Sequence, residues 1–338
     1  MEPGFEAAKG AAEKLFGVQF PVFMRIILPG LMASAVFYPA IGWALGHLPG
    51  DPDHLWERIL GYAALVVLLG ALISTLNSEI YKIYEGRTHW PSGLKAWGIR
   101  RQQAQVDKLQ KTISSAATQA EYDEAWSELR VYPTSDRGDP EATHPTRIGN
   151  ILAGYEQYPN TRYGMDSVFY WPRIWLQIDK DVKEEIDSQW SVADGFLTLS
   201  AIAYAGAAIW LAQALLAIFG IGLAWLAFGT ASLATLAVPA WLAIGYISYE
   251  LSLPFHRENG EVFKSIFDVH REKVRNMITF KPNEKETWRA AWAYLQYQAM
   301  KCPNCGKYTN GADKCDKCGF GLAERNKSFL DSGKFPGT

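Results

Sequence analysis

Residues 195–249 read GFLTLSAIAYAGAAIWLAQALLAIFGIGLAWLAFGTASLATLAVPAWLAIGYISY and contain no charged side chain. A membrane-spanning helix needs about 20 predominantly apolar residues to cross a hydrocarbon core of roughly 30 Å. A run of 55 residues is too long for one such helix and suits two helices joined by a tight turn. Gly220 and Gly222 are the best place for that turn, so the sequence predicts spans over residues 195–219 and 223–249.

Two further apolar runs lie earlier in the chain. The first covers residues 21–48 and contains Pro29 and Pro39, which predict kinks. The second covers residues 59–80, and the turn between the two runs is rich in glycine, proline and aspartate. We therefore expect an all-α integral membrane protein with four transmembrane helices, arranged as two pairs on either side of a large central segment.

The placement of lysine and arginine predicts the orientation of these helices. Residues 81–194 contain 14 of them and residues 251–338 contain 15, whereas the expected turn between the third and fourth helices has none. Because segments rich in Lys and Arg stay on the cytoplasmic side, we expect both termini and the central segment to be cytoplasmic, in a multi-pass protein of the inner membrane. The net charge of -2 does not indicate a nucleic-acid binder.

Small residues on the second and third predicted helices indicate close helix packing. The second helix carries Gly61, Gly70 and Ser74, and the third is rich in alanine between residues 201 and 212. Small side chains let two helix backbones approach closely. The sequence leaves open whether the partner helices belong to the same chain or to another copy.

The central segment predicts a helical hairpin. Apolar residues recur at steps of three and four from Val106 to Ala120. Thr118 and Glu121 form a capping box that would start a second helix. Residues 131–144 are rich in Pro, Gly and Asp and predict a loop.

Two helix boundaries are expected beside the third and fourth spans. Residues 179–189 form a charged helix with no breaker before residue 195, so this helix should continue into the third span. After the fourth span, Pro254 and Gly260 are expected to interrupt the chain before further cytoplasmic helices begin.

Residues 145–175 combine arginines and aromatic side chains around a central acid, Asp166. The notable side chains are Arg147, Arg162, Arg173, Asp166, Trp171 and Trp175. They could bind an anionic group through the arginines, lie on the inner membrane surface among lipid headgroups, or form a buried network between the arginines and Asp166. We favour the membrane surface. The passage resembles a cytoplasmic segment of uncharacterised bacterial membrane proteins with a two-plus-two transmembrane layout, a resemblance that implies no activity.

All four cysteines lie in two short motifs, CPNCG at 302–306 and CDKCG at 315–319. Each motif brings two thiolates to one ion, and four thiolates make the closed tetrahedral site that zinc prefers. The pattern resembles small zinc ribbons at the ends of many bacterial and archaeal proteins. The predicted ligands of a structural Zn2+ are Cys302, Cys305, Cys315 and Cys318. An iron–sulfur cluster or a redox-active C-x-x-C is the alternative.

We expect the purified protein to hold about one zinc ion per chain. Cys305→Ser should release the ion because a closed site needs every ligand, while the helices of the membrane part should keep their stability. Elemental analysis and thermal denaturation measure these two results. Wild-type protein without metal, or with the visible absorption of an iron–sulfur cluster, would contradict the prediction.

The expected organisation follows from these segments. In chain order it is an N-terminal cytoplasmic amphipathic segment rather than a cleaved signal peptide (1–20), transmembrane helices 1 and 2 (21–80), a cytoplasmic helical domain (81–194), transmembrane helices 3 and 4 (195–250), cytoplasmic helices (251–300), a zinc ribbon (301–322) and a flexible tail (323–338).

The sequence contains none of the common catalytic or nucleotide-binding motifs, so an enzyme is not favoured. Inside the predicted spans, ionisable residues occur only near the ends, at Arg25, Glu79 and Glu250. Ion-coupled transporters usually carry such groups at depth, which disfavours that class.

The leading hypothesis is a membrane-anchored scaffold or regulatory subunit that recruits a cytoplasmic partner through its helical domain and zinc ribbon. The alternative is an oligomeric pore lined by one face of the second helix, although the same face could instead contact another helix. Its lining would come from Gly70, Ser74, Asn77, Ser78 and Tyr81. The two-plus-two layout resembles bestrophin-type channels in architecture alone. A lipid-active enzyme using Asp166 and His144 is the third hypothesis. Expected partners are the lipid bilayer and either further copies or other membrane subunits, and nucleic acid is not expected.

Overall fold

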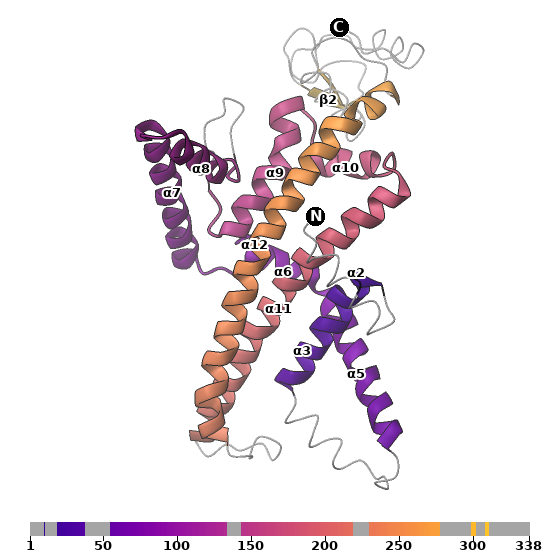
Figure 1. The fold of residues 1–338 in the computed structure, drawn as a ribbon, viewed down its shortest axis with the longest axis vertical. Helices are drawn as coiled ribbons and strands as arrows, with labels where there is room; N and C mark the ends of the chain where they lie inside the picture. Colours follow the sequence, from indigo (N-terminus) through magenta and orange to yellow (C-terminus); the bar gives the residue numbers. More distant parts are fainter. Residues whose placement is uncertain are drawn as a thin grey trace. The chain divides into compact units, whose positions relative to one another are not determined.

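The computed structural model describes residues 10, 19–37, 55–133, 143–218, 230–277, 299–301 and 308–310. The chain divides into two compact units, each built from two stretches of sequence. The first unit is Met1–His89 with Glu184–His256, and the second is Trp90–Lys183 with Arg257–Thr338. Figure 1 shows that the described elements are helices, apart from two short strands.

The first unit holds the apolar helices. They are α2 (Phe20–Val22), the π-helical turn η1 (Phe23–Ile27), α3 (Leu28–Val36), α5 (Leu55–Thr75), α6 (Asn77–Tyr84), most of α11 (Lys180–Ile218) and the first part of α12 (Thr230–Met277). In the described part of the chain, α11 and α12 are long and apolar enough to cross a membrane, and α5 with α6 makes a third span if the bent pair counts as one. These helices indicate a membrane protein.

The first predicted span is described only in part. Phe20–Val36 forms a shorter apolar helix. Residues 38–54, which would complete this span and its turn, lie outside the described residues, as does the predicted turn at Gly220 and Gly222. Two spans, or three with the bent pair, are therefore what the described helices provide.

Glycines bring α5 into close contact with the N-terminal helices. A Cβ atom at Gly30 of α3 would overlap the backbone carbonyl of Val66, and one at Gly70 of α5 would overlap the carbonyl of Ile26. The predicted role of small residues in helix packing is confirmed at Gly70. Gly61 lies on the same helix but has no neighbouring atom within 4 Å among the described residues.

Helices α11 and α12 also pack closely, and Figure 1 shows their apolar parts side by side. Gly206 of α11 faces the Trp241 ring of α12, where an added Cβ would lie 3.3 Å from the indole. Ser200 donates a hydrogen bond to the Gly245 carbonyl at 2.8 Å. The alanine-rich third span therefore meets the fourth span of the same chain.

The second predicted span is bent rather than being one helix over residues 59–80. Helices α5 and α6 meet at 52° around Leu76. The Thr75 hydroxyl donates to the Leu72 carbonyl at 2.6 Å, and the Leu76 N–H donates to Ile73, three residues earlier instead of four. Threonine hydroxyls that compete for helix carbonyls bend helices, which accounts for the bend without a proline.

The predicted interruption after the fourth span is wrong, because α12 continues through Pro254 and Gly260 to Met277. Proline removes one N–H, but its fixed φ matches the helical value. Gly260 serves close packing, since a Cβ there would lie 2.7 Å from the Tyr155 ring. The predicted continuation of residues 179–189 into the third span is confirmed by α11.

The second unit is a helical domain. Its described elements are α7 (Ser92–Ser115), α8 (Gln119–Leu129), α9 (Arg147–Tyr163), α10 (Ser167–Trp175), the remaining parts of α11 and α12, and strands β1 (Ala299–Lys301) and β2 (Tyr308–Asn310). The predicted cap is confirmed, because the Thr118 side chain accepts the Glu121 N–H at 3.2 Å. Helices α7 and α8 form the predicted pair around Val106, Leu109 and Leu129.

Candidate functional site at the charged ends of the apolar helices

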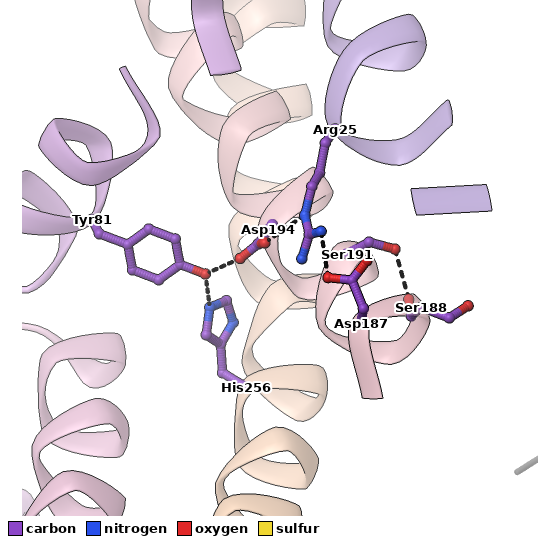
Figure 2. Close-up of polar contacts among 7 residues, drawn as sticks. All are labelled: Arg25, Tyr81, Asp187, Ser188, Ser191, Asp194 and His256. Atoms are coloured by element: carbon purple, nitrogen blue, oxygen red, sulfur yellow. Dashed lines mark hydrogen bonds and ion pairs between the residues drawn. The ribbon is translucent and has the colours of Figure 1, made fainter. Parts of the chain in front are cut away.

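Ionisable and polar side chains from four helical segments of the first unit meet in one group, which Figure 2 shows. Arg25 comes from η1, Tyr81 from α6, Asp187 and Asp194 from α11, and His256 from α12. We call these five residues the polar cluster. Asp194 directly precedes the charge-free run that begins at residue 195, so the cluster lies where the apolar part of α11 starts.

Arg25 binds two carboxylates on one face of α11. Its Nε donates to Asp194 Oδ2 at 2.9 Å, and its Nη1 donates to Asp187 Oδ1 at 2.7 Å. Two helical turns take about seven residues, so the two aspartates lie one above the other. The Arg25 side chain is 29% exposed and that of Asp194 is 18% exposed. Their ion pair is therefore less screened by solvent than a surface pair.

Arg25 also occupies an unusual stretch of backbone. It is the central residue of η1, a five-residue π-helical turn between two α-helical segments. Such turns are rare and often occur at functional sites.

Tyr81 links Asp194 to a buried histidine. Its hydroxyl oxygen lies 2.5 Å from Asp194 Oδ1 and 3.0 Å from His256 Nε2. The other ring nitrogen of His256, Nδ1, lies 2.8 Å from the Ser252 carbonyl oxygen. A carbonyl oxygen can only accept a hydrogen bond, so Nδ1 carries a hydrogen and Nε2 faces Tyr81.

The cluster can hold a proton in two positions. Tyr81 has one hydroxyl hydrogen, so one of its two contacts needs a hydrogen from its partner. Either His256 is an imidazolium that donates to Tyr81 while Tyr81 donates to Asp194, or Asp194 is protonated and donates while Tyr81 donates to His256. Both arrangements contain the same number of protons, so Tyr81 can pass a proton between the other two.

A smaller polar group joins α9 to α12 in the second unit. The Tyr158 and Tyr163 hydroxyls both donate to Asp268 Oδ1, at 2.9 and 2.6 Å. Burial and the hydrogen bond to the Asp268 carboxylate raise the pKa of both tyrosines. Both hydroxyls therefore stay protonated at neutral pH and act as donors, which suits a structural link.

Two of the five predicted pore-lining residues make contacts between helices. Gly70 packs against the Ile26 backbone, and Tyr81 belongs to the polar cluster. Of the others, Ser74 and Asn77 are half-buried and Ser78 is exposed. The bend at Leu76 separates Gly70 and Ser74 from the other three predicted lining residues, so the five do not lie on one straight helix.

The residues singled out in segment 145–175 have separate local roles. Asp166 caps α10 by accepting the Phe169 N–H at 2.7 Å. Arg173 donates to the Phe169 carbonyl at 2.6 Å, and its guanidinium lies 3.8 Å from the Phe169 ring centroid. Arg162 is exposed near the end of α9, and Arg147 lines a cavity at the start of the same helix. The structure therefore does not bring the three arginines together around Asp166.

The two tryptophans of this passage pack within the second unit. The Trp171 ring is centred 4.7 Å from that of Phe263 on α12 and 5.3 Å from that of Trp175. Both tryptophans are half-buried. Their placement at a lipid surface stays a prediction. His144, the other residue of the enzyme hypothesis, is half-buried and donates its N–H to Asn150.

Several predicted segments lie outside the described residues. These include the four zinc ligands Cys302, Cys305, Cys315 and Cys318, most of segment 1–20, residues 134–142 of the predicted loop, residues 278–298, and the tail at 323–338.

Asp187, Asp194 and His256 are functional candidates that the sequence analysis missed. A signal for the first two was available, because they are seven residues apart on a helix that was expected to be continuous. Comparison of the chain with known protein families, with curated proteins and with solved structures finds no match.

Proposed function

We propose that this protein is a membrane-anchored scaffold or regulatory subunit that recruits a partner through its helical domain. The observation that carries the proposal is that polar side chains of the first unit form hydrogen bonds between helices. Arg25 joins η1 to α11, and Tyr81 joins α6 to both α11 and α12. Nearer the apolar parts, the Ser34 and Tyr62 hydroxyls join α3 to α5 at 2.7 Å.

An ion conduit needs polar groups that line a water-filled path, whereas these groups bond to one another. Interhelical hydrogen bonds of this kind stabilise a bundle in lipid, which is what an anchor requires. Proton transfer is a second candidate function, favoured by the arrangement of Asp194, Tyr81 and His256, because chains of acids and histidines at membrane helices mark proton pathways.

The proposal includes four membrane spans, both termini on the cytoplasmic side of the inner membrane, and a C-terminal structural zinc ribbon. The Lys and Arg distribution supports the orientation. The ribbon is supported by β1 and β2, which pair antiparallel with Lys301 opposite Tyr308. The first C-x-x-C motif falls in the sequence between these paired strands, as expected for a zinc-binding hairpin.

Helix α8 offers a surface for partner recruitment. Tyr122 and Trp126 are 38% and 46% exposed, and their rings stack with centroids 6.4 Å apart. Exposed aromatic side chains of this kind are the usual anchors of protein interfaces.

A photo-crosslinking amino acid at Trp126 of the full-length protein in cells should give one discrete protein adduct. The matched control is Glu124, which is exposed and about 200° around the same helix, and should give little or none. Purified protein in liposomes should give no ion or proton flux above empty liposomes. Adducts to lipid alone would overturn the scaffold proposal and indicate that α8 lies on the membrane surface. A flux that Tyr81→Phe abolishes would overturn it in favour of proton transfer.

A further inference from the structure

A cavity of about 290 Å³ lies within the second unit. Helices α7, α8, α9 and α12 contribute to its wall. The charged lining residues are Arg101, Glu128, Arg147 and Arg257. Among the described residues that line the cavity, three guanidinium groups and one carboxylate are present, so the positive charges exceed the negative ones by two.

The pKa of Tyr132, which also lines the cavity, depends on these charges. Burial raises the pKa of its hydroxyl, whereas Arg147 and Arg257 act in the opposite direction and Glu128 adds to the increase. Arg147 on α9 and Arg257 on α12 thus both affect the pKa of one residue in the cavity wall, so both charges lie near the cavity.

One N–H group of Arg257 lacks an acceptor in the part of the chain that the structure describes. Its Nε is buried and has no hydrogen-bond partner among the described residues. Arg130, which follows α8, is not among the cavity-lining residues and pairs with Glu261 at 3.3 Å. A guanidinium in a cavity is most often matched by a carboxylate or a phosphate group.

The cavity wall is held in place by buried amides. Asn150 is 0% exposed, and its side chain accepts the His144 N–H at 2.6 Å and donates to the Thr146 carbonyl at 2.8 Å. The Gln102 side-chain oxygen accepts from the Tyr132 hydroxyl at 3.1 Å and from Asn150 at 3.4 Å. These bonds fix the start of α9, and with it Arg147, against α7 before any ligand arrives.

We propose that this cavity binds the phosphate group of a small molecule. Guanidinium groups recognise phosphate oxygens with paired N–H donors, and arginines on three different helices can reach a tetrahedral anion from different sides. The volume is at the lower end of the range for ligand pockets, roughly 300–1,000 Å³, which suits a phosphate with a small substituent. The phosphate could come from a soluble metabolite or from a lipid headgroup.

The test is calorimetric titration of the full-length protein, in a neutral phosphate-free detergent, with inorganic pyrophosphate. We expect saturable binding that chloride at matched ionic strength does not reproduce. Arg257→Gln should weaken the binding by about tenfold or more. Arg101 lines the cavity and is exposed, so Arg101→Gln should also weaken the binding and disturb folding less. Arg162→Gln is the control, since Arg162 is exposed and does not line the cavity.

Competition distinguishes the two sources of phosphate. Displacement of pyrophosphate by short-chain phosphatidic acid assigns the site to a lipid headgroup, and displacement by glycerol 3-phosphate alone assigns it to a soluble ligand. Absence of saturable binding to the wild-type protein would overturn the proposal. So would unchanged affinity in both Arg257→Gln and Arg101→Gln.

Discussion

Arg25→Gln is expected to lower the free energy of unfolding of the full-length protein in detergent more than the loss of any surface charge. The substitution leaves Asp194 and Asp187 without the guanidinium that now binds both. Breaking a fully buried pair costs about 3–5 kcal/mol. The expected cost here is somewhat lower because Arg25 keeps 29% of its side chain exposed. Denaturation followed by circular dichroism measures the change.

Lys82→Gln is the matched control on α6. Lys82 pairs with Glu79 at 2.6 Å, but both side chains are nearly half exposed, at 46% and 48%, so its loss should cost at most about 1 kcal/mol. The double variant Arg25→Gln with Asp194→Asn should recover part of the stability, because the unpaired carboxylate is then removed. Equal effects of Arg25→Gln and Lys82→Gln would mean that the polar cluster does not hold the helices together.

The type of fold was predictable because it depends on local sequence. Apolar runs separated by charged segments predict membrane helices, and the described parts of all four runs are helical. The bend at Leu76 was not predicted, since it depends on whether the Thr75 hydroxyl bonds back to its own helix, and most threonines in helices cause no break. Gly260 inside α12 packs against the Tyr155 ring, a residue distant in sequence, so its packing role was not visible from the local pattern.

The candidate site was predictable only as a set of unpaired charges. Arg25 was recognised as an ionisable residue near the end of a span, but its partner Asp194 is 169 positions away. Such a pairing depends on how η1 and α11 pack, and the spacing of residues within one helix does not determine it. The spacing of Asp187 and Asp194 shows that they share a face, yet only the packing shows that one arginine reaches both.

Gly70→Ala is expected to destabilise the pairing of α5 with the N-terminal helix. The added Cβ would overlap the backbone carbonyl of Ile26, and a backbone atom cannot move aside by changing a rotamer. The helices must separate, which gives up the close contact on which small-residue packing in lipid depends. Overpacking of this kind costs about 1–3 kcal/mol. A lower thermal midpoint and faster proteolysis of the detergent-solubilised protein would report it.

Gly61→Ala is the control on the same helix. Its added Cβ meets no atom within 4 Å among the described residues, and alanine is favoured over glycine inside a helix by about 1 kcal/mol. This variant should therefore be neutral or slightly more stable than the wild type. The two substitutions make the same chemical change, so a difference between them isolates the contact with Ile26. If Gly70→Ala were as stable as Gly61→Ala, the close crossing of α5 and η1 would not exist in the membrane protein.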